Sequence, residues 1–565
     1  MADNIARQYF MDEELTKNSD CPHDMRQTTP FYMRSKLMGG LFAAAVCLLA
    51  ALICITIVSK CSPLYAFHDG NDVNWFLTMG RGMAQGKVPY KDLFEQKGVL
   101  LYMLFALNYL ICGNSLYFIW IVEVVCLALF CFIAFRTARL FAGYVPSLAV
   151  ALICAPLASS SYAFASGGGE VEEYFLPVLT YAVYLAVRML RGERLPLCCA
   201  AICGMFSGII FWIKYTSLVM FAVLAVCIFV ECCLNGKARL GFAYAGIFIA
   251  AFVAVSVPPL VYFVVNGAVG DMWRVYFLDN IFGYGVRWVS RLGSMFLNML
   301  FCAPLYIGAA FALLYVWKLA CGTRHKVYFT AMVALTFLIQ CVTAGGIVYY
   351  HLVMAAFLPL GLLGARTGTA AVAAAVCAPF RGNCGVSSVG ERFALRRDRF
   401  CAGMSRAARD MSACVHAGIN VATAALCMAL LAAVSLVFGN NTLELFRPRD
   451  SYPQFMAAEI MKGEGSLLTY KTFGRGFYTA RDEVPQFYYF AKNNFDRQSF
   501  PDMYEAQEGY VARGEADFVI TTAACWDEER DTLLSGYEVI ADLSYRHIEC
   551  NTDIQNTALY LLALK

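Results

Sequence analysis

The chain has 565 residues, of which 60% are hydrophobic and only 15% are charged, and its mean hydropathy is +0.58. This composition is far more apolar than that of a soluble protein of the same length, so it indicates a polytopic membrane protein. The net charge of +3 comes from basic residues scattered in short loops. Because nucleic-acid binding requires a basic face or stripe, no nucleic-acid partner is expected.

Residues 1–36 are polar and lack the charged start and apolar core of a cleavable signal peptide. We expect them to form a cytoplasmic tail and the apolar run 37–58 to be an uncleaved first membrane span. The polar stretch 60–98 would then be the first extracytoplasmic loop.

The number of spans depends on the apolar run 98–112. It has about 15 residues, short of the ~20 that a spanning helix needs. If it does not cross, the basic clusters of all later loops face the cytoplasm, as the positive-inside rule requires; if it crosses, they all face outside. We therefore interpret 98–112 as a juxtamembrane or re-entrant helix. Eleven spans are predicted, at 37–58, 115–135, 144–161, 171–187, 197–213, 215–234, 241–265, 294–317, 327–343, 347–365 and 415–438, with a transmembrane domain over 37–439 and a basic cytoplasmic loop at 366–412.

From residue 440 onward charges and turn residues increase, and no window is apolar enough to span a membrane. We expect 440–565 to be a soluble extracytoplasmic domain of roughly 125 residues, a typical domain size. Short β-like runs at 466–470, 517–522, 537–543 and 558–562, with a helical pattern at 503–514, predict a small α/β unit. The predicted fold class is a polytopic α-helical membrane protein with a small C-terminal α/β domain.

Most of the 24 cysteines lie inside apolar runs, where cysteine behaves as a small hydrophobic residue. No Cys/His spacing matches a zinc site, so no metal site is predicted, and the need for a divalent metal stays open. Cys525 and Cys550 fall in the polar C-terminal region, where a disulfide and two free thiols are both compatible with the sequence.

The stretch 68–101 is the longest polar and aromatic interruption in the first half of the chain. Ionisable groups beside membrane spans are costly unless they face water or serve a function, so we interpret it as the active-site loop. Its pattern consists of Asp69-Gly70, Gly82, Gly86, Pro89-Tyr90, Asp92-Leu93-Phe94 and Lys97-Gly98.

This pattern resembles the first extracytoplasmic loop of the GT-C membrane glycosyltransferases. More narrowly, it is similar to their bacterial branch related to protein mannosyltransferases and lipid A aminoarabinose transferases. The chain departs at Val99, where many members have proline after the Lys-Gly pair.

The resemblance implies a GT-C-like fold in the plasma (inner) membrane and an inverting glycosyltransferase. The enzyme would move a sugar from a polyprenyl-phosphate donor to an extracytoplasmic acceptor, which could be a glycan, a lipid or a protein. A multi-pass transporter is an alternative, but transporters place ionisable residues inside their spans and often show repeated halves. A non-catalytic envelope assembly protein is another, and only mutagenesis separates it from an enzyme.

Glycosidic bond formation requires a base that removes the proton of the attacking acceptor hydroxyl. The resemblance assigns this role to the first acidic residue after the first span, Asp69. An ordinary turn is the alternative, because Asp-Gly and Asn-Asp are common turn sequences. Asp72, about one helical turn further, is the second candidate.

A leaving phosphate needs cationic or hydrogen-bonding groups around it. Lys97 is the first candidate, with a lysine extending to lipid headgroups as the alternative. Lys214 and His351 are further candidates for binding the phosphate. The alternative for Lys214 is an interfacial anchor, and the alternative for His351 is a core histidine whose hydrogen bonds are satisfied. Asp92 is a supporting acid with a structural role as its alternative, and the resemblance implies that Glu172 or Glu173 contributes to the site. The substrate-loop candidates are Tyr90 and Tyr350.

Overall fold

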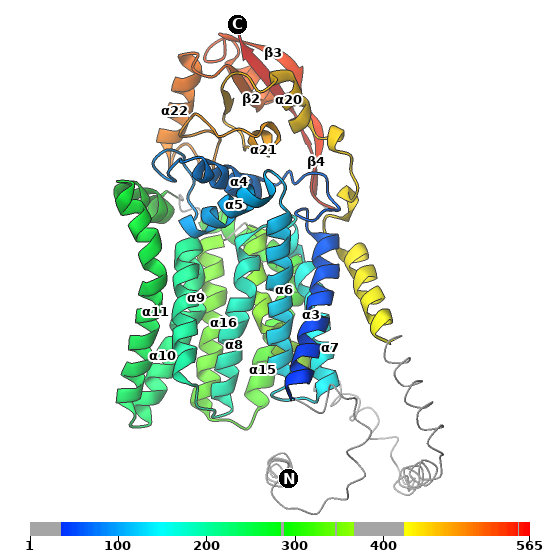
Figure 1. Cartoon of the computed structure of the whole chain (residues 1–565), viewed down its shortest axis with the longest axis vertical. Helices are drawn as coiled ribbons and strands as arrows, with labels where there is room; N and C mark the ends of the chain where they lie inside the picture. The colour runs from blue at the N-terminus through cyan, green and yellow to red at the C-terminus, as the bar shows by residue number, and fades with distance from the viewer. Residues whose placement is uncertain (1–35, 284–287, 345–346, 367–422, 552) are drawn as a thin grey trace, which may run out of the picture.

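The structure is a computed structural model that describes residues 36–283, 288–344, 347–366, 423–551 and 553–565. Figure 1 shows a bundle of long helices, a β-containing unit at one end of it, and two helices lying across the bundle between them. The predicted N-terminal tail and the predicted basic loop 366–412 lie outside the described residues, apart from Lys36 and Arg366.

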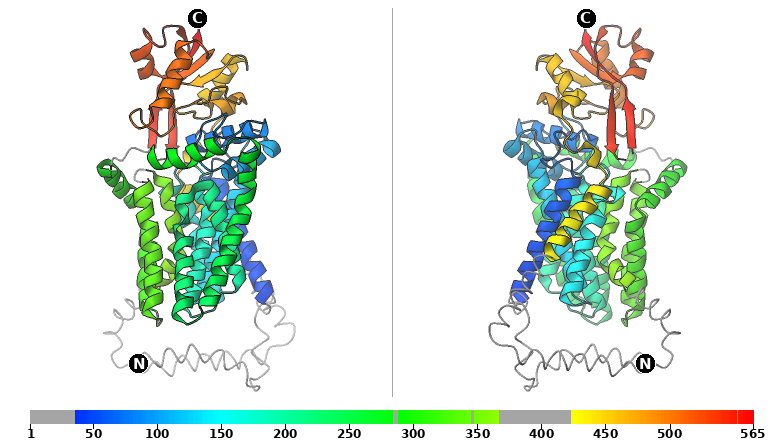
Figure 2. Two further views of the ribbon diagram at one scale, coloured as in Figure 1. Left: turned by 90° about the vertical axis from the view of Figure 1, so that its left-hand side faces the viewer. Right: turned by 90° about the vertical axis from the view of Figure 1, so that its right-hand side faces the viewer.

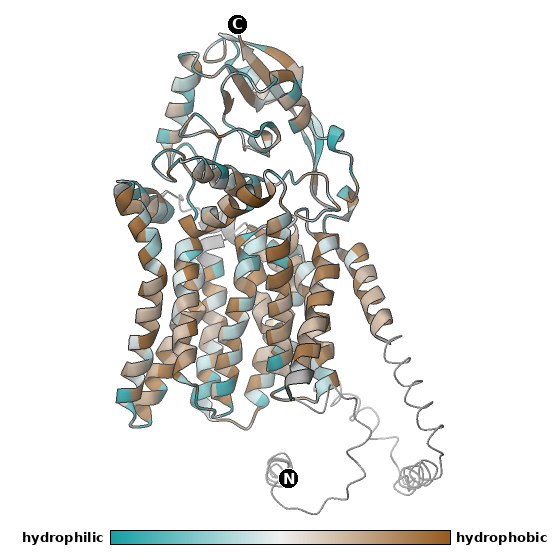
Figure 3. Cartoon of the chain, viewed as in Figure 1, coloured by the Kyte–Doolittle hydropathy of each residue, from teal (hydrophilic) through white to brown (hydrophobic). Residues whose placement is uncertain are grey.

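The bundle is built from helices whose sequences are apolar nearly all the way round. Such helices suit a membrane, because lipid tails and neighbouring helices are both apolar, and Figure 3 shows hydrophobic residues along their whole length. The helices are α3 (Lys36–Val58), α6 (Tyr117–Ala138), α7 (Tyr144–Ser159), α8 (Val171–Leu190), α9 (Leu197–Lys214), α10 (Val219–Leu234), α11 (Ala238–Val265), α15 (Ala303–Lys318), α16 (Thr323–Ala344), Val348–Arg366 with its first part η4 (Val348–Phe357) in 3-10 conformation, and Thr423–Phe438.

In the part of the chain that the structure describes, six helical runs are long and apolar enough to cross a membrane, or seven if a bent pair counts as one span. One of the six, Leu197–Leu234, has 38 residues. A straight helix of that length would extend about 57 Å, nearly twice the ~30 Å hydrocarbon core, and a 3-10 turn at Tyr215–Leu218 separates α9 from α10. The helical multi-span class is therefore confirmed, and the number eleven stays a prediction.

The predicted span 294–317 is not a continuous helix. It is divided between α14 (Trp288–Phe301) and α15, whose axes meet at 83°. A proline in the first turn of α15 favours a new helix start there, because proline has no N–H to donate to the preceding turn. On α14, Phe296, Leu297 and Leu300 are more than half exposed, as expected for a helix that faces lipid.

The run 98–112 forms α5 (Val99–Cys112), which packs against α4 (Asn71–Ala84). Both helices lie across the end of the bundle, as Figures 1 and 2 show, in agreement with the predicted juxtamembrane helix. Their close approach depends on Gly80, where a Cβ would lie 2.5 Å from the backbone nitrogen of Ala106.

The C-terminal unit contains a four-stranded sheet in the order β1-β2-β6-β3, where β1 is parallel to β2 and the other pairs are antiparallel. All four strands and helix α22 (Pro501–Ala512) lie at predicted positions, so the small α/β unit is confirmed. The strands are β1 (Leu467–Thr469), β2 (Phe518–Thr522), β3 (Tyr537–Asp542) and β6 (Leu559–Leu564). The other α-helices described in this unit are α20 (Pro453–Met461), α21 (Phe477–Arg481) and α23 (Ala523–Glu529). Cys525 is a free thiol.

A second, two-stranded sheet was not predicted. It is the antiparallel hairpin of β4 (Tyr545–Cys550) and β5 (Asp553–Thr557). In Figure 2 its strands extend from the C-terminal unit toward the helix bundle, so this unit contacts the bundle directly.

The fully buried guanidinium of Arg81 also joins the two parts. It donates to the carbonyls of Tyr478 at 2.8 Å and Glu483 at 2.6 Å in the C-terminal unit, and to Asn114 Oδ1 at 2.5 Å. Because a buried cation is costly unless its donors are satisfied, this contact fixes α4 against the C-terminal unit.

Candidate active site

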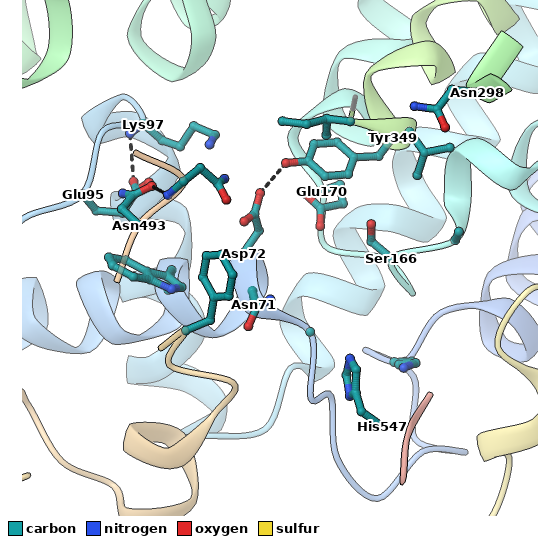
Figure 4. A pocket seen from close by; sticks show the side chains of 18 of the residues that line it. Asn71, Asp72, Glu95, Lys97, Ser166, Glu170, Asn298, Tyr349, Asn493 and His547 are labelled. Carbon is teal, nitrogen blue, oxygen red and sulfur yellow. Dashed lines mark hydrogen bonds between the residues drawn. The ribbon is translucent and has the colours of Figure 1, made fainter. Parts of the chain in front are cut away.

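A cavity of about 370 Å³ lies where the two parts meet (Figure 4). Its walls come from the first loop and α4, the turn before α8, the start of the Val348–Arg366 helix, α14 and the C-terminal unit. The ionisable residues in its lining, tyrosines aside, are Lys60, Asp72, Glu95, Lys97, Glu170 and His547.

Asp72 lies in the first turn of α4, where the helix dipole favours a negative charge. Its Oδ2 accepts a hydrogen bond of 2.6 Å from the hydroxyl of Tyr349, and both side chains face the cavity in Figure 4. The carboxylate is therefore within reach of a molecule bound in the cavity.

Glu170 caps α8 directly after three glycines that all have positive φ, at +92°, +96° and +76°. A side chain at Gly168 would collide with Ser59 and Glu123, so the tight turn requires glycine there. Burial and the nearby negative charge of Asp72 raise the pKa of the Glu170 carboxyl well above its usual range. The site thus pairs an accessible carboxylate with a carboxyl that tends to keep its proton.

Lys97 lies in the cavity lining beside Asn493 and Asn494 of the C-terminal unit. Its backbone N–H donates to Glu95 Oε2 at 2.8 Å, and Glu95 also accepts from the hydroxyl of Tyr102. These contacts hold the segment before α5, so the structure places a lysine in the same cavity as Asp72.

Asp69 does not line the cavity. Its carboxylate is fully buried, with Oδ1 3.1 Å from Lys60 Nζ and Oδ2 2.8 Å from His547 Nδ1. Burial alone would raise the pKa of this carboxyl, but the charge of Lys60 and the hydrogen bond with His547 hold that pKa well below its usual range. A carboxylate with both oxygens occupied is poorly placed to take a proton from the cavity, which differs from the position expected for a base.

Lys60 extends this buried network. Its ammonium pairs with Asp69 and Glu444, and donates to the carbonyl of Ile548 at 2.8 Å. Glu444 is in turn paired with Arg447 at 2.7 Å. The network ties the first loop to the segment that enters the C-terminal unit and to the hairpin β4–β5.

Lys214, Glu172 and Tyr350 form a separate cluster that does not line the cavity. Lys214 is ion-paired with Glu172, and its Nζ lies 2.9 Å from the ring centroid of Tyr350. This geometry is a cation–π contact in addition to an ion pair. The cluster supports the elements behind the cavity.

His351 and Glu173 are also buried outside the lining. His351 Nδ1 is hydrogen-bonded to the hydroxyl of Tyr306, and the residue is almost fully buried. Glu173 completes a capping box at the start of α8, accepting from the backbone N–H of Glu170 at 3.3 Å.

Tyr90 and Asp92 support the first loop from within. The Tyr90 hydroxyl donates to the carbonyl of Lys97, and its ring is stacked on Phe263 with centroids 5.5 Å apart. Asp92 Oδ2 accepts from the backbone N–H of Val88 at 2.7 Å, the loop-backbone role that was the structural alternative.

Most of the lining residues were not selected as candidates from the sequence, among them Tyr349, Glu170 and His547. Tyr349 and Glu170 each lie beside residues that were selected, and the run of glycines before Glu170 was a usable signal, because successive positive-φ positions fix the next side chain. His547 belongs to the unpredicted hairpin and is separated from Asp69 by 478 positions, so no local pattern could have found it.

Among the described residues, no group of three or more His, Cys, Asp or Glu side chains is arranged to hold a metal ion.

Solved structures share a similar fold with nearly the whole chain, in agreement with the expected multi-span helical fold. The similar solved structures include two of ArnT, a lipid A aminoarabinose transferase, from Cupriavidus metallidurans. ArnT bound to undecaprenyl phosphate matches with a TM-score of 0.52 and 14% identity, over 92% of this chain and 97% of that chain. Apo ArnT matches with a TM-score of 0.50 and 13% identity over the same shares. No family model and no curated protein matches the sequence.

Proposed function

We propose that this protein is an inverting glycosyltransferase that moves a sugar from a polyprenyl-phosphate donor to a cell-envelope acceptor. The observation that carries the proposal is the joint presence of Asp72, Glu170 and Lys97 in one cavity at the end of the bundle. The fold adds support, since ArnT, which has a similar fold, binds undecaprenyl phosphate. A bundle of apolar helices suits a donor whose tail stays in the bilayer while its head enters a polar cavity.

We place the cavity on the extracytoplasmic side of the plasma (inner) membrane, with the N-terminus in the cytoplasm. The turns between α6 and α7, α8 and α9, α10 and α11, and α15 and α16 carry the basic residues of the short loops. These turns lie at the end of the bundle away from the C-terminal unit (Figure 1). The positive-inside rule makes that end cytoplasmic.

In the proposed reaction Asp72 takes the role that the sequence analysis gave to Asp69. It removes the proton of the acceptor hydroxyl as that oxygen attacks the anomeric carbon. The bond from this carbon to the phosphate oxygen breaks, and the phosphate leaves with the electron pair. A single displacement inverts the configuration at the carbon.

Lys97 stabilises the charge that develops on the leaving phosphate. Burial and the charge of Asp72 raise the pKa of the Glu170 carboxyl, so in its protonated form Glu170 donates a hydrogen bond instead of adding a second negative charge near the phosphate. Lys214 and Glu172 hold the walls of the site without contacting substrate.

The test is a transfer assay on the purified full-length protein in lipid nanodiscs. Radiolabelled polyprenyl-phosphate sugars are supplied one at a time with a cell-envelope extract as acceptor. We expect label to move to the extract from at least one donor, and the Asp72→Asn variant to transfer none above background. Transfer by no donor, or equal transfer by Asp72→Asn, would refute the proposal.

A further inference from the structure

Among the residues that the structure describes, His547 is the one histidine in the cavity lining. It lies on β4 and pairs with Gln555 across the hairpin. Although only 3% of the residue is exposed, the cavity reaches it. The hairpin therefore delivers a titratable side chain from the C-terminal unit into the site.

Asp69 determines which ring nitrogen of His547 carries the proton. The ionised carboxylate of Asp69 only accepts hydrogen bonds, so Nδ1, which lies 2.8 Å away, must donate. In a neutral imidazole with its proton on Nδ1, the lone pair is on Nε2. The Asp69 contact thus fixes the tautomer and the ring orientation of a cavity residue, as carboxylates do for catalytic histidines.

Protein groups already occupy the ammonium of Lys60 beside His547. Lys60 Nζ lies 3.1 Å from Asp69 Oδ1, donates to the carbonyl of Ile548 at 2.8 Å, and is ion-paired with Glu444. This ammonium is therefore not available to bind a phosphate at the His547 end of the cavity.

The opposite end differs. In Figure 4 Lys97, Glu95 and Asn493 lie on one side of Asp72, and His547 lies on the other. The cavity thus has Lys97 toward one end and His547 with the ion-paired Lys60 toward the other, and the proposed base lies between them.

We propose that His547 is an acceptor-binding residue, whose Nε2 accepts a hydrogen bond from an uncharged hydroxyl group of the acceptor, and that Asp69 is the positioning residue that holds it. This inference rests on the proposed function, and it deepens it by assigning the His547 end of the cavity to the acceptor and the Lys97 end to the donor phosphate. The acceptor that fits this end is a neutral, hydroxyl-bearing group such as a sugar ring.

The first test measures whether Nε2 is available. Diethylpyrocarbonate, which reacts with an unprotonated imidazole nitrogen, is added to the full-length protein in nanodiscs, and modified peptides are quantified by mass spectrometry. His68 is the matched control, because it is as buried as His547. Its Nδ1 accepts from Gly70 at 3.1 Å and its Nε2 lies 3.2 Å from the Gly168 carbonyl. Burial and the charge of Lys60 lower the pKa of His68 to about 4.

We expect His547 to react at least about tenfold faster than His68. Asp69→Asn should slow the reaction at His547, because an amide can donate to Nδ1 and so move the imidazole proton to Nε2. Equal resistance of His547 and His68 in the wild type would overturn the inference, whether or not the Asp69 variant folds.

The second test separates acceptor from donor binding with the transfer assay. His547→Phe keeps a flat ring without nitrogens, and His547→Gln keeps an amide oxygen near the Nε2 position. We expect His547→Phe to raise the apparent KM for the envelope extract about tenfold with an unchanged KM for the donor, and His547→Gln to restore most of the loss. A rise in the KM for the donor instead would indicate that the donor binds at the His547 end, and it would refute the assignment of that end to the acceptor. If the wild type transfers no sugar, the proposed function and the acceptor role fail together, while the modification experiment still decides whether Nε2 is accessible.

Discussion

Asp69 and Asp72 are three positions apart, yet they belong to two regions with different physical chemistry. Asp69 is part of a buried network in which each charge faces an opposite charge. Asp72 begins α4, contacts one hydroxyl and lines a cavity. The same side-chain type therefore holds two parts of the protein together in one region and faces a cavity in the other. The difference shows that partners and access, and not residue type, decide which carboxylate can act as a base.

The largest expected effect separates the two regions directly. Asp72→Asn keeps the side-chain size and the helix start but removes the basic oxygen. We expect turnover to fall by about 10²–10⁴-fold, with the melting temperature in detergent nearly unchanged. Transfer rates and thermal unfolding are measured on the same preparation. Wild-type turnover of the Asp72→Asn variant would show that another residue is the base.

Asp69→Asn should act mainly on stability. It leaves the buried ammonium of Lys60 without one of its two carboxylates, and breaking a buried ion pair from one side costs about 3–5 kcal/mol. We expect a clear fall in the melting temperature of the purified protein. The double variant Lys60→Met, Asp69→Asn is the control, because removing both charges should recover part of the loss. An unchanged melting temperature in the Asp69→Asn variant would show that the buried network contributes little to stability.

Lys97→Ala tests the donor end of the cavity. A hydrogen bond to a charged group contributes about 1.5–3 kcal/mol, so we expect the KM for the polyprenyl-phosphate sugar to rise about tenfold or more. Lys214→Ala is the matched comparison, since Lys214 does not line the cavity. Equal effects of the two substitutions on the donor KM would contradict the assignment of the phosphate to Lys97.

Glu170 makes the smallest and most specific prediction, a dependence of stability on pH. Its pKa is raised in the folded protein, so the folded state binds more protons than the unfolded state above the unfolded pKa of about 4.3. Stability therefore falls as pH rises from that value toward the folded pKa. Glu170→Gln removes this loss of stability. The melting temperature of the variant minus that of the wild type should therefore increase as the pH rises from 5 to 8. A constant difference over that range would mean that Glu170 ionises normally.

The sequence predicted the helices well, because a membrane span is a long apolar run and its signal is local. It also predicted that 98–112 does not cross the membrane, because only then do the basic residues of the later loops face the cytoplasm, as the positive-inside rule requires. The strands of the main sheet were visible as short β-like runs. The break between α14 and α15 was not predicted, because hydropathy is insensitive to a change of direction, which here falls between Phe301 and Ala303.

The site was harder to predict, since it depends on contacts between distant segments. Asp69 and Asp72 look equivalent in the sequence, and only Lys60 and His547 distinguish them. Lys60 follows the end of the first span, and the sequence shows no partner for its charge. The hairpin that carries His547 has few apolar residues and no Asn-Gly or Asp-Gly turn, so the usual hairpin signals were absent.

The contact between Asp69 and His547 also has a consequence for biosynthesis. The two residues are 478 positions apart, and at bacterial-scale synthesis rates of about 5–20 residues per second the second follows the first on the order of a minute later. During that interval Asp69 and Lys60 have already been synthesised, while the ribosome is still making the hairpin that completes the cavity. A nascent chain would therefore lack a finished cavity, and the proposed transfer could not begin before the C-terminal unit had been made and folded.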